Sequence, residues 1–167
     1  MIHGILIYGI ITSFLLTGLI LGSLRVNSRL WIQDLPKELK ALIPSKTPKE
    51  KKQSLYLTFI FLIIFFLGPI AGIVDLLGVT GIRAGFWQSI ILSYGIYSIF
   101  NLVDLLIVDW LFICFITPGF VLIPGITAAQ LKDYNKHFRD FIKGIFIIII
   151  PSMITGSIGY LLLQYLI

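Results

Sequence analysis

Four long apolar stretches alternate with polar connections along the chain, and they cover residues 2–24, 55–79, 86–116 and 144–167. Each stretch reaches the roughly 20 residues that a helix needs to cross the hydrocarbon core of a bilayer. None of them alternates apolar and polar positions with a period of two, which is the pattern of a transmembrane barrel strand. Helices are the other structure that satisfies its own backbone hydrogen bonds in lipid. The pattern therefore predicts an all-α membrane protein with four transmembrane helices in a single membrane domain.

Composition excludes a soluble globular domain. Hydrophobic residues make up 57% of the 167 residues, charged residues only 13%, and the mean hydropathy is +0.99. Soluble domains contain roughly 25% charged residues. The single cysteine, Cys114, excludes a disulfide framework and a cysteine-based zinc site. The two histidines, His3 and His137, fall on opposite sides of the predicted membrane, so we expect no metal site and no cofactor.

Basic residues are concentrated in two of the three connections. Residues 25–52 hold eight of the thirteen Lys and Arg residues and residues 132–143 hold four, whereas the second connection holds only Arg83. The first and third connections of a four-span protein lie on one side, and the positive-inside rule makes that side cytoplasmic. We therefore expect a multi-pass protein of the inner or plasma membrane with both termini outside. This topology accounts for the net charge of +5, so we expect contact with membrane lipids and no nucleic-acid binding.

Both basic connections carry signals for the start of a helix. Thr47-Pro48-Lys49-Glu50 and Thr127-Ala128-Ala129-Gln130 are capping boxes, which would start the second and fourth spanning helices before the membrane. A short amphipathic helix over residues 35–43, capped by Asp34, would either lie in the headgroup region or cover the cytoplasmic end of the bundle. Residues 117–126 are expected to cover that end too, because non-helical backbone at membrane depth must be shielded.

Small residues and prolines predict where the helices approach one another and where they bend. Small side chains four residues apart allow two helix backbones to come close together. Proline removes a backbone donor inside a helix and produces a kink. The small residues are Gly18 and Gly22 in the first span and Ser152, Thr155, Gly156 and Gly159 in the fourth, and the expected bends are at Pro69, Gly144 and Pro151.

The third span carries a polar seam that is the candidate binding site. Four polar side chains fall within a sector of about 80° on an α-helix. They are Tyr94, Tyr97, Asn101 and Asp104. A charge near the bilayer centre costs at least roughly 2.5 kcal/mol, so Asp104 should face the bundle interior. Asp109 lies about 140° round an α-helix from Asp104, so the two carboxylates would not converge without a break in the helix.

Three interpretations of Asp104 remain open. It could be structural and bind polar residues of the first span, it could belong to a proton- or cation-coupled binding site, or it could act in catalysis with Asp109 or Asp75. Asp109 itself is expected near the membrane interface, where it would pair with a basic residue. The basic residues within its expected reach are Arg25, Arg139 and Lys143.

Arg25 and Arg29 follow the first span four residues apart, and Trp31 comes shortly after them. This spacing would let them clamp the phosphate of a lipid headgroup. Alternatively, they anchor the basic side of the membrane together with an aromatic residue of the interfacial belt.

Parts of the connections resemble a family of small prokaryotic membrane proteins of uncharacterised function. The resemblance is carried by residues 27–36 (NSRLWIQDLP), 44–47 (PSKT), 104–110 (DLLIVDW) and 132–138 (KDYNKHF), and with the spans it covers most of the chain. The family has Asn-Pro-Arg where this chain has Asn27-Ser28-Arg29, so this loop is expected to turn differently. The resemblance implies no reaction, and it suggests only that the cytoplasmic connections matter to function.

These observations predict a non-enzymatic membrane protein that binds or moves a small solute or lipid near Asn101 and Asp104. One alternative is a lipid-modifying or proteolytic membrane enzyme that uses aspartates. Another is an accessory subunit of a larger membrane complex. Four helices leave little room for a solvated path, so a transporter of this size is expected to form a homodimer.

Overall fold

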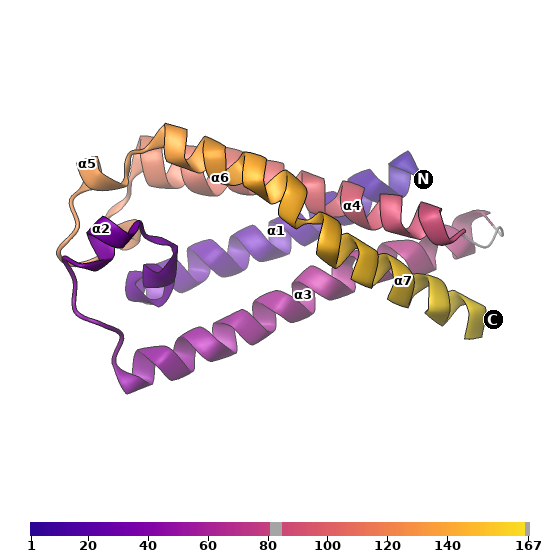
Figure 1. Ribbon diagram of the computed structural model, residues 1–167, viewed down its shortest axis with the longest axis horizontal. Coiled ribbons are helices and arrows are strands. Elements are labelled where there is room, and N and C mark those ends of the chain that lie inside the picture. The colour runs from indigo at the N-terminus through magenta and orange to yellow at the C-terminus, as the bar shows by residue number, and fades with distance from the viewer. Residues whose placement is uncertain (81–84, 166–167) are drawn as a thin grey trace.

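The computed structural model describes residues 1–80 and 85–165, which form one elongated bundle of helices (Figure 1). Among these residues, four helical segments are long and apolar enough to cross a membrane, and no strand is present. The segments are Ile2–Val26, Pro48–Leu76, Phe86–Ile116 and Ala128–Tyr165. The prediction of an all-α membrane protein with four spans is confirmed, and the chain is a polytopic membrane protein. Arg83, the basic residue of the second connection, lies outside the described residues.

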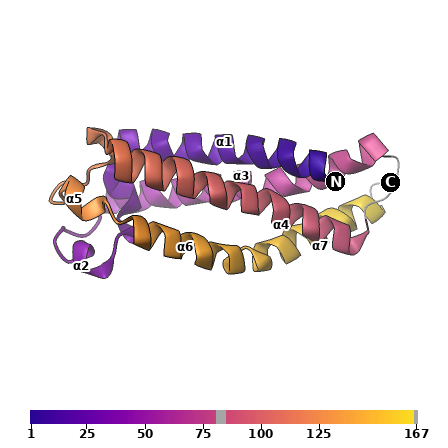
Figure 2. The same ribbon diagram turned by 90° about the horizontal axis from the view of Figure 1, so that it is seen from above.

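The two ends of the bundle differ. Helices α1 (Ile2–Val26), α3 (Pro48–Thr80), α4 (Phe86–Val103) and α7 (Ile149–Tyr165) pack together, and the N-terminus of α1 and the end of α7 lie at one end (Figures 1 and 2). We call this the terminal end. The two Lys- and Arg-rich connections form the other end, which we call the basic end. Figure 1 shows α3 diverging from α6 (Tyr134–Ile147) towards the basic end.

Helix α4 continues into a π-helix, η2 (Asp104–Ile116). In a π-helix each N–H bonds to the carbonyl five residues earlier, and such segments are rare and frequent at functional sites. The last turn shows this pattern, since Thr117 N donates to Phe112 O at 2.9 Å. Thr117 then ends the helix in the left-handed region, with φ of 47°. The wider turn places residues five apart on nearly the same face, which changes the geometry of Asp104 and Asp109.

The first connection is less helical than the sequence indicated. It contains a 3-10 helix, η1 (Ser28–Asp34), and one helical turn, α2 (Lys37–Lys40). The helix expected over residues 35–43 therefore begins only at Lys37, and Asp34 ends η1 and does not cap α2. The reason is Pro36, because the residue before a proline avoids the helical region. Leu35 is accordingly extended, with φ of −69° and ψ of 149°.

Both predicted capping boxes are present. Thr47 N donates to Glu50 Oε2 at 2.8 Å, and Glu50 N donates to Thr47 Oγ1 at 3.2 Å. Thr127 N and Thr127 Oγ1 donate to Gln130 Oε1 at 2.8 and 2.9 Å, and Gln130 N donates to Thr127 O at 3.1 Å. Each box satisfies backbone donors that a helix start leaves free.

The fourth span is divided twice, and the sequence analysis did not predict the first division. Helix α5 (Ala128–Leu131) stops after one turn, and α6 starts again at Tyr134. The new start is capped by Asp133, whose carboxylate accepts from Lys136 N at 2.9 Å. Asp side chains favour such caps over helix interiors because they bind nearby backbone N–H groups.

The bend in the fourth span lies between α6 and α7, at Ile148, and not at Gly144. Pro151 explains this position, since it has no N–H for the carbonyl of Ile147 and its ring crowds that carbonyl. Pro69, by contrast, lies inside α3, which continues past it.

The small residues predicted to make close contacts do so in the fourth span, but the pair predicted in the first span does not. A Cβ atom built on Gly156 would lie 2.7 Å from the Cα atom of Ile90, so α4 and α7 are close enough there to require glycine. The predicted contact of the fourth span is therefore confirmed. Nothing lies within 4 Å of a Cβ atom built on Gly18 or Gly22, so the contact predicted there is wrong. The buried positions of α1 lie on a different face, at Gly9, Thr12, Ser13, Leu16, Ile20 and Leu24.

The two connections of the basic end pack against each other and cover it. Their buried apolar residues form one cluster with η2, which also takes in partly buried residues of the first connection. Residues 117–126 thus have the covering arrangement that we expected. The buried members are Ile43, Ile123, Ile126 and Leu131, and the partly buried ones include Ile32, Leu35, Leu39, Ile113 and Leu122.

Candidate functional site

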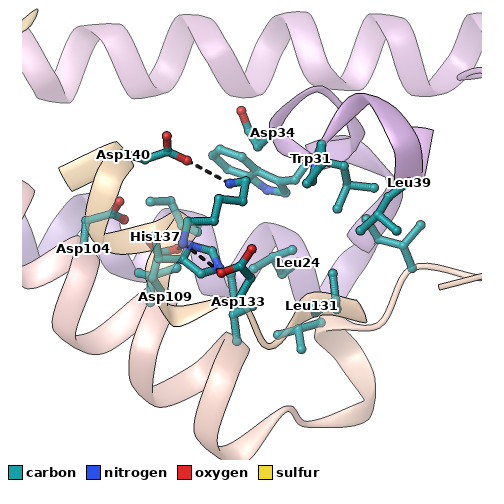
Figure 3. A pocket seen from close by; sticks show the side chains of 18 of the residues that line it. Leu24, Trp31, Asp34, Leu39, Asp104, Asp109, Leu131, Asp133, His137 and Asp140 are labelled. Carbon is teal, nitrogen blue, oxygen red and sulfur yellow. Dashed lines mark hydrogen bonds and ion pairs between the residues drawn. The ribbon is translucent and has the colours of Figure 1, made fainter. Parts of the chain in front are cut away.

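A pocket of about 440 Å³ lies at the basic end of the bundle (Figure 3). Ligand pockets commonly have volumes of roughly 300–1,000 Å³. One wall is apolar and comes from α1, α3, α4 and η2, and the other is polar and comes from η1, η2 and α6. The apolar wall includes Ile20, Leu24, Phe61, Phe100, Val108 and Ile113, and the polar groups include Asp34, Asp104, Asp109, Asp133, Lys136, His137 and Asp140. The pocket is therefore amphiphilic.

Asp104 and Asp109 both line this pocket, and both also line a smaller cavity of about 100 Å³ beside it. We expected them to converge only if the helix were broken, and η2 is such a break. They are five residues apart, and η2 brings such residues to nearly the same face where an α-helix would place them about 140° apart. Asp75, the other acid considered for catalysis, lies on α3 outside the residues that line this pocket.

Asp109 pairs with His137, and not with the arginines or the lysine that the sequence suggested. His137 Nδ1 lies 3.0 Å from Asp109 Oδ1, and the two side chains are only 12% and 20% exposed. The pair forms because the first turn of α6 passes alongside η2. A carboxylate on Nδ1 orients the imidazole ring and directs Nε2 away from the carboxylate. This contact has no local signature in the sequence, because it depends on how two distant segments pack.

Some of the other charged side chains of the polar wall have a partner and some do not. Lys136 Nζ lies 2.9 Å from Asp140 Oδ2, and Asp133 caps α6. Within the described part of the chain, Asp34 and Asp104 have no ion-pair or hydrogen-bond partner. The partly buried Asp104 carboxylate therefore lines the pocket without a positive charge or a hydrogen-bond donor paired with it among the described residues.

Asp34 lies at the mouth of the pocket. It remains open to solvent, yet the surrounding protein displaces enough water to raise the pKa of its carboxyl above the ordinary value. Lys40, Lys46 and Lys136 oppose this shift by attraction to the charged form. The negative charge of Asp109 adds to the rise in the pKa of Asp34.

Three residues of the polar seam, Tyr94, Tyr97 and Asn101, make contacts between helices. Tyr94 OH donates to Ile145 O at 3.3 Å, and Asn101 Nδ2 donates to Phe141 O at 3.1 Å, so both tie α4 to α6. Tyr97 is completely buried and stacks on a phenylalanine of α3 with ring centroids 4.2 Å apart. Of the four seam residues, Asp104 lines the large pocket and Asn101 lines the small cavity. A binding role for the two tyrosines stays a prediction.

The structure separates Arg25, Arg29 and Trp31. Arg25 is exposed at the end of α1. Arg29 Nε lies 2.7 Å from Glu50 Oε1, and Arg29 Nη2 donates to Pro44 O at 3.0 Å, so its guanidinium fastens the first connection to α3. Trp31 lines the pocket and donates from Nε1 to an α1 hydroxyl. Contact of these residues with a lipid headgroup stays a prediction.

Sequence reasoning did not find several residues of the site. Trp31 was predicted at a lipid headgroup or as an interfacial anchor, and Asp34 as a helix cap. His137 was considered only as a surface or packing residue or as part of a weak metal site, and none of the three was placed in this pocket. These residues lie in three of the segments that carry the family resemblance, residues 27–36, 104–110 and 132–138. All three segments contribute residues to the pocket.

The chemistry available at the site is that of carboxylates, an imidazole and an apolar wall. In the described residues no group of three or more His, Cys, Asp or Glu side chains is arranged to hold a metal ion. Comparisons with protein-family models, with curated proteins and with solved structures give no match. The function is therefore argued from the geometry of the pocket.

Proposed function

We propose that this polytopic membrane protein binds a small amphiphilic solute or a lipid in the pocket at its basic end. One observation carries the proposal, which is the pairing of an apolar wall with a carboxylate-rich wall in a pocket of ligand size. We further propose that the basic end faces the cytoplasm, in accord with the positive-inside rule. The ligand would then be taken up from the cytoplasm or from the cytoplasmic leaflet.

The lining of the pocket supports access from the membrane. Phe61 of α3 and Asp140 of α6 both line it, and Figure 1 shows these two helices separating towards the basic end. The part of α3 near Phe61 is largely exposed in the bundle, at Leu55, Tyr56, Phe59, Ile60, Leu62 and Ile63. An apolar tail could therefore extend into lipid while the polar group of the same molecule stays in the pocket.

Binding is supported more directly than transport. Between the pocket and the terminal end, the bundle is filled by side chains that are at most 2% exposed: Ile73, Leu92, Ile96 and Leu163. Movement of a solute to the far side would require this core to open. The path is closed in this conformation.

The proposal is tested by the small molecules that remain bound after gentle purification. Leu39→Trp would fill the pocket, because Leu39 lines it. Leu42→Trp is the matched control, since Leu42 belongs to the same segment but is 59% exposed and is not among the lining residues. Native mass spectrometry should show a bound small mass in the wild type and in Leu42→Trp, and its loss in Leu39→Trp.

Three other results would contradict this proposal. They are a wild type without bound mass, an equal mass in both variants, or a second protein that accounts for the added mass. The last result would favour an accessory subunit. The same spectra give the subunit number, and a homodimer would keep open the transport role suggested for a protein of this size.

A second candidate function rests on the His137–Asp109 pair. A histidine held by a carboxylate is a common general base, and His137 stands in the pocket beside a further acid, Asp104. This arrangement is compatible with a membrane enzyme that hydrolyses or modifies the bound molecule. The pocket would serve both functions, so binding and turnover have to be measured separately.

A further inference from the structure

The pocket contains more negative than positive groups. Five aspartates line it, and the cationic or ionisable partners among the lining residues are Lys136 and His137. Each of these two is already engaged, since His137 pairs with Asp109 and Lys136 with Asp140. Two carboxylates, those of Asp34 and Asp104, remain without an ion-pair partner in the described residues.

Asp104 is the most constrained of these carboxylates. It lies where α4 passes into η2, and the buried side chains of Phe100 and Val108 line the same pocket. A carboxylate in such surroundings loses hydration, and this loss is costly unless a positive charge or hydrogen bonds replace the water. The pocket in front of Asp104 is the space from which a ligand could supply that positive charge.

Trp31 gives an independent indication of the ligand's charge. Its indole lines the pocket, and its orientation is fixed because Nε1 donates to Ser23 Oγ at 2.9 Å. Figure 3 shows Trp31 close to Asp34, with Asp104 and Asp109 bordering the same space. The face of an indole attracts organic cations through its quadrupole. An aromatic face, an apolar wall and uncompensated carboxylates thus surround one pocket.

We infer that the pocket selects an organic cation with an apolar body, such as a hydrophobic amine or quaternary cation, over an anion of the same shape. This inference rests on the proposed function and specifies its ligand class. An inorganic cation fits less well, because it would leave the apolar wall unused.

The test uses two probes of nearly the same shape and opposite charge, tetraphenylphosphonium and tetraphenylborate. Equilibrium dialysis against the full chain in lipid nanodiscs, with empty nanodiscs as the blank, measures specific binding of each probe. We expect saturable binding of tetraphenylphosphonium at one site per chain, at least about tenfold tighter than that of tetraphenylborate.

Two substitutions that each remove one negative charge show which residue produces the selectivity for the cation. Asp104→Asn should weaken tetraphenylphosphonium binding about tenfold. It should not weaken tetraphenylborate binding, because it removes a negative charge that repels the anion. Glu38→Gln is the control, since it removes the same charge from an exposed position of α2 outside the pocket lining. If Asp104→Asn does not insert into the membrane, Asp34→Asn at the mouth of the pocket replaces it, with the same expected direction.

The outcomes separate this inference from the proposed function. Equal binding of both probes, each abolished by Leu39→Trp, would overturn the cation selectivity and leave a binding pocket. Tighter binding of the anion, or equal weakening by Asp104→Asn and Glu38→Gln, would also overturn it. Absence of probe binding would overturn it as well, while the masses retained on purification would decide the proposed function independently.

Discussion

At the scale of single residues, the central feature is the contact between Asp109 and His137. The two residues lie on η2 and α6, and each would be costly to bury alone. Paired at 3.0 Å, the two side chains satisfy each other's polar groups beside Asp104. The pair could either hold α6 against η2 or supply a base to a bound molecule. A substitution that preserves packing can separate these roles.

His137→Gln keeps a hydrogen-bonding side chain of similar size but removes the imidazole. If His137 acts as a base, the variant should retain the bound small molecule in unmodified form, because binding relies on the walls of the pocket. Loss of a general base typically slows a reaction by about 10²–10⁴-fold. The measurement compares the masses of bound molecules in wild type and variant before and after incubation.

Tyr134→Phe serves as the control, since Tyr134 lies on the same helix and is not among the pocket-lining residues. Identical time courses in wild type and His137→Gln, with no mass change in either, would exclude turnover. The pair would then have a purely structural role.

At the scale of elements, helix starts and spans follow from local sequence, whereas the shape of the site does not. Thr47 and Glu50 are three residues apart, so their capping box could be predicted. Pro36 could also have been used to predict the extended Leu35, because this effect is local too. The π-helical turn at Asp104 has no such local signature, and the approach of His137 to Asp109 depends on how η2 and α6 pack.

Packing between elements gives a prediction at two glycines. Gly156→Ala would place a methyl group 2.7 Å from the Cα atom of Ile90, so α4 and α7 would have to separate. We expect a loss of about 2 kcal/mol in the free energy of unfolding, which is typical of overpacking. Unfolding in a denaturing detergent, followed by circular dichroism, measures this loss.

Gly18→Ala is the matched control, because nothing lies within 4 Å of a Cβ atom built there. It should be neutral or stabilise the helix by up to about 1 kcal/mol. If Gly18→Ala proved as destabilising as Gly156→Ala, the outward face of α1 would be a packed interface in the membrane.

At the scale of the whole molecule, the bundle is asymmetric. The terminal end has a filled core, and the basic end contains the pocket under a cover of two connections. We propose, from the positive-inside rule, that the basic end faces the cytoplasm. The side on which the pocket opens determines which pool of molecules can reach it.

Cysteine labelling tests this orientation. Cys114 is 1% exposed and can be replaced by alanine to give a background without cysteine. In that background, a membrane-impermeant maleimide should label His3→Cys in intact cells, because residue 3 lies at the terminal end. Glu38→Cys, in α2, should be labelled only after permeabilisation. The reverse pattern would place the pocket on the outer side.

The break at Ile148 has a mechanical consequence. Helix α7 is anchored by five buried positions, whereas α6 has none and is held mainly by polar contacts such as that of Asn101. The proline at 151 removes the backbone hydrogen bond that would stiffen the joint between them. The fourth span therefore has a well-buried half, α7, and a half without buried residues, α6. Since Lys136, His137 and Asp140 lie on α6, a change of angle at Ile148 would change the size of the pocket.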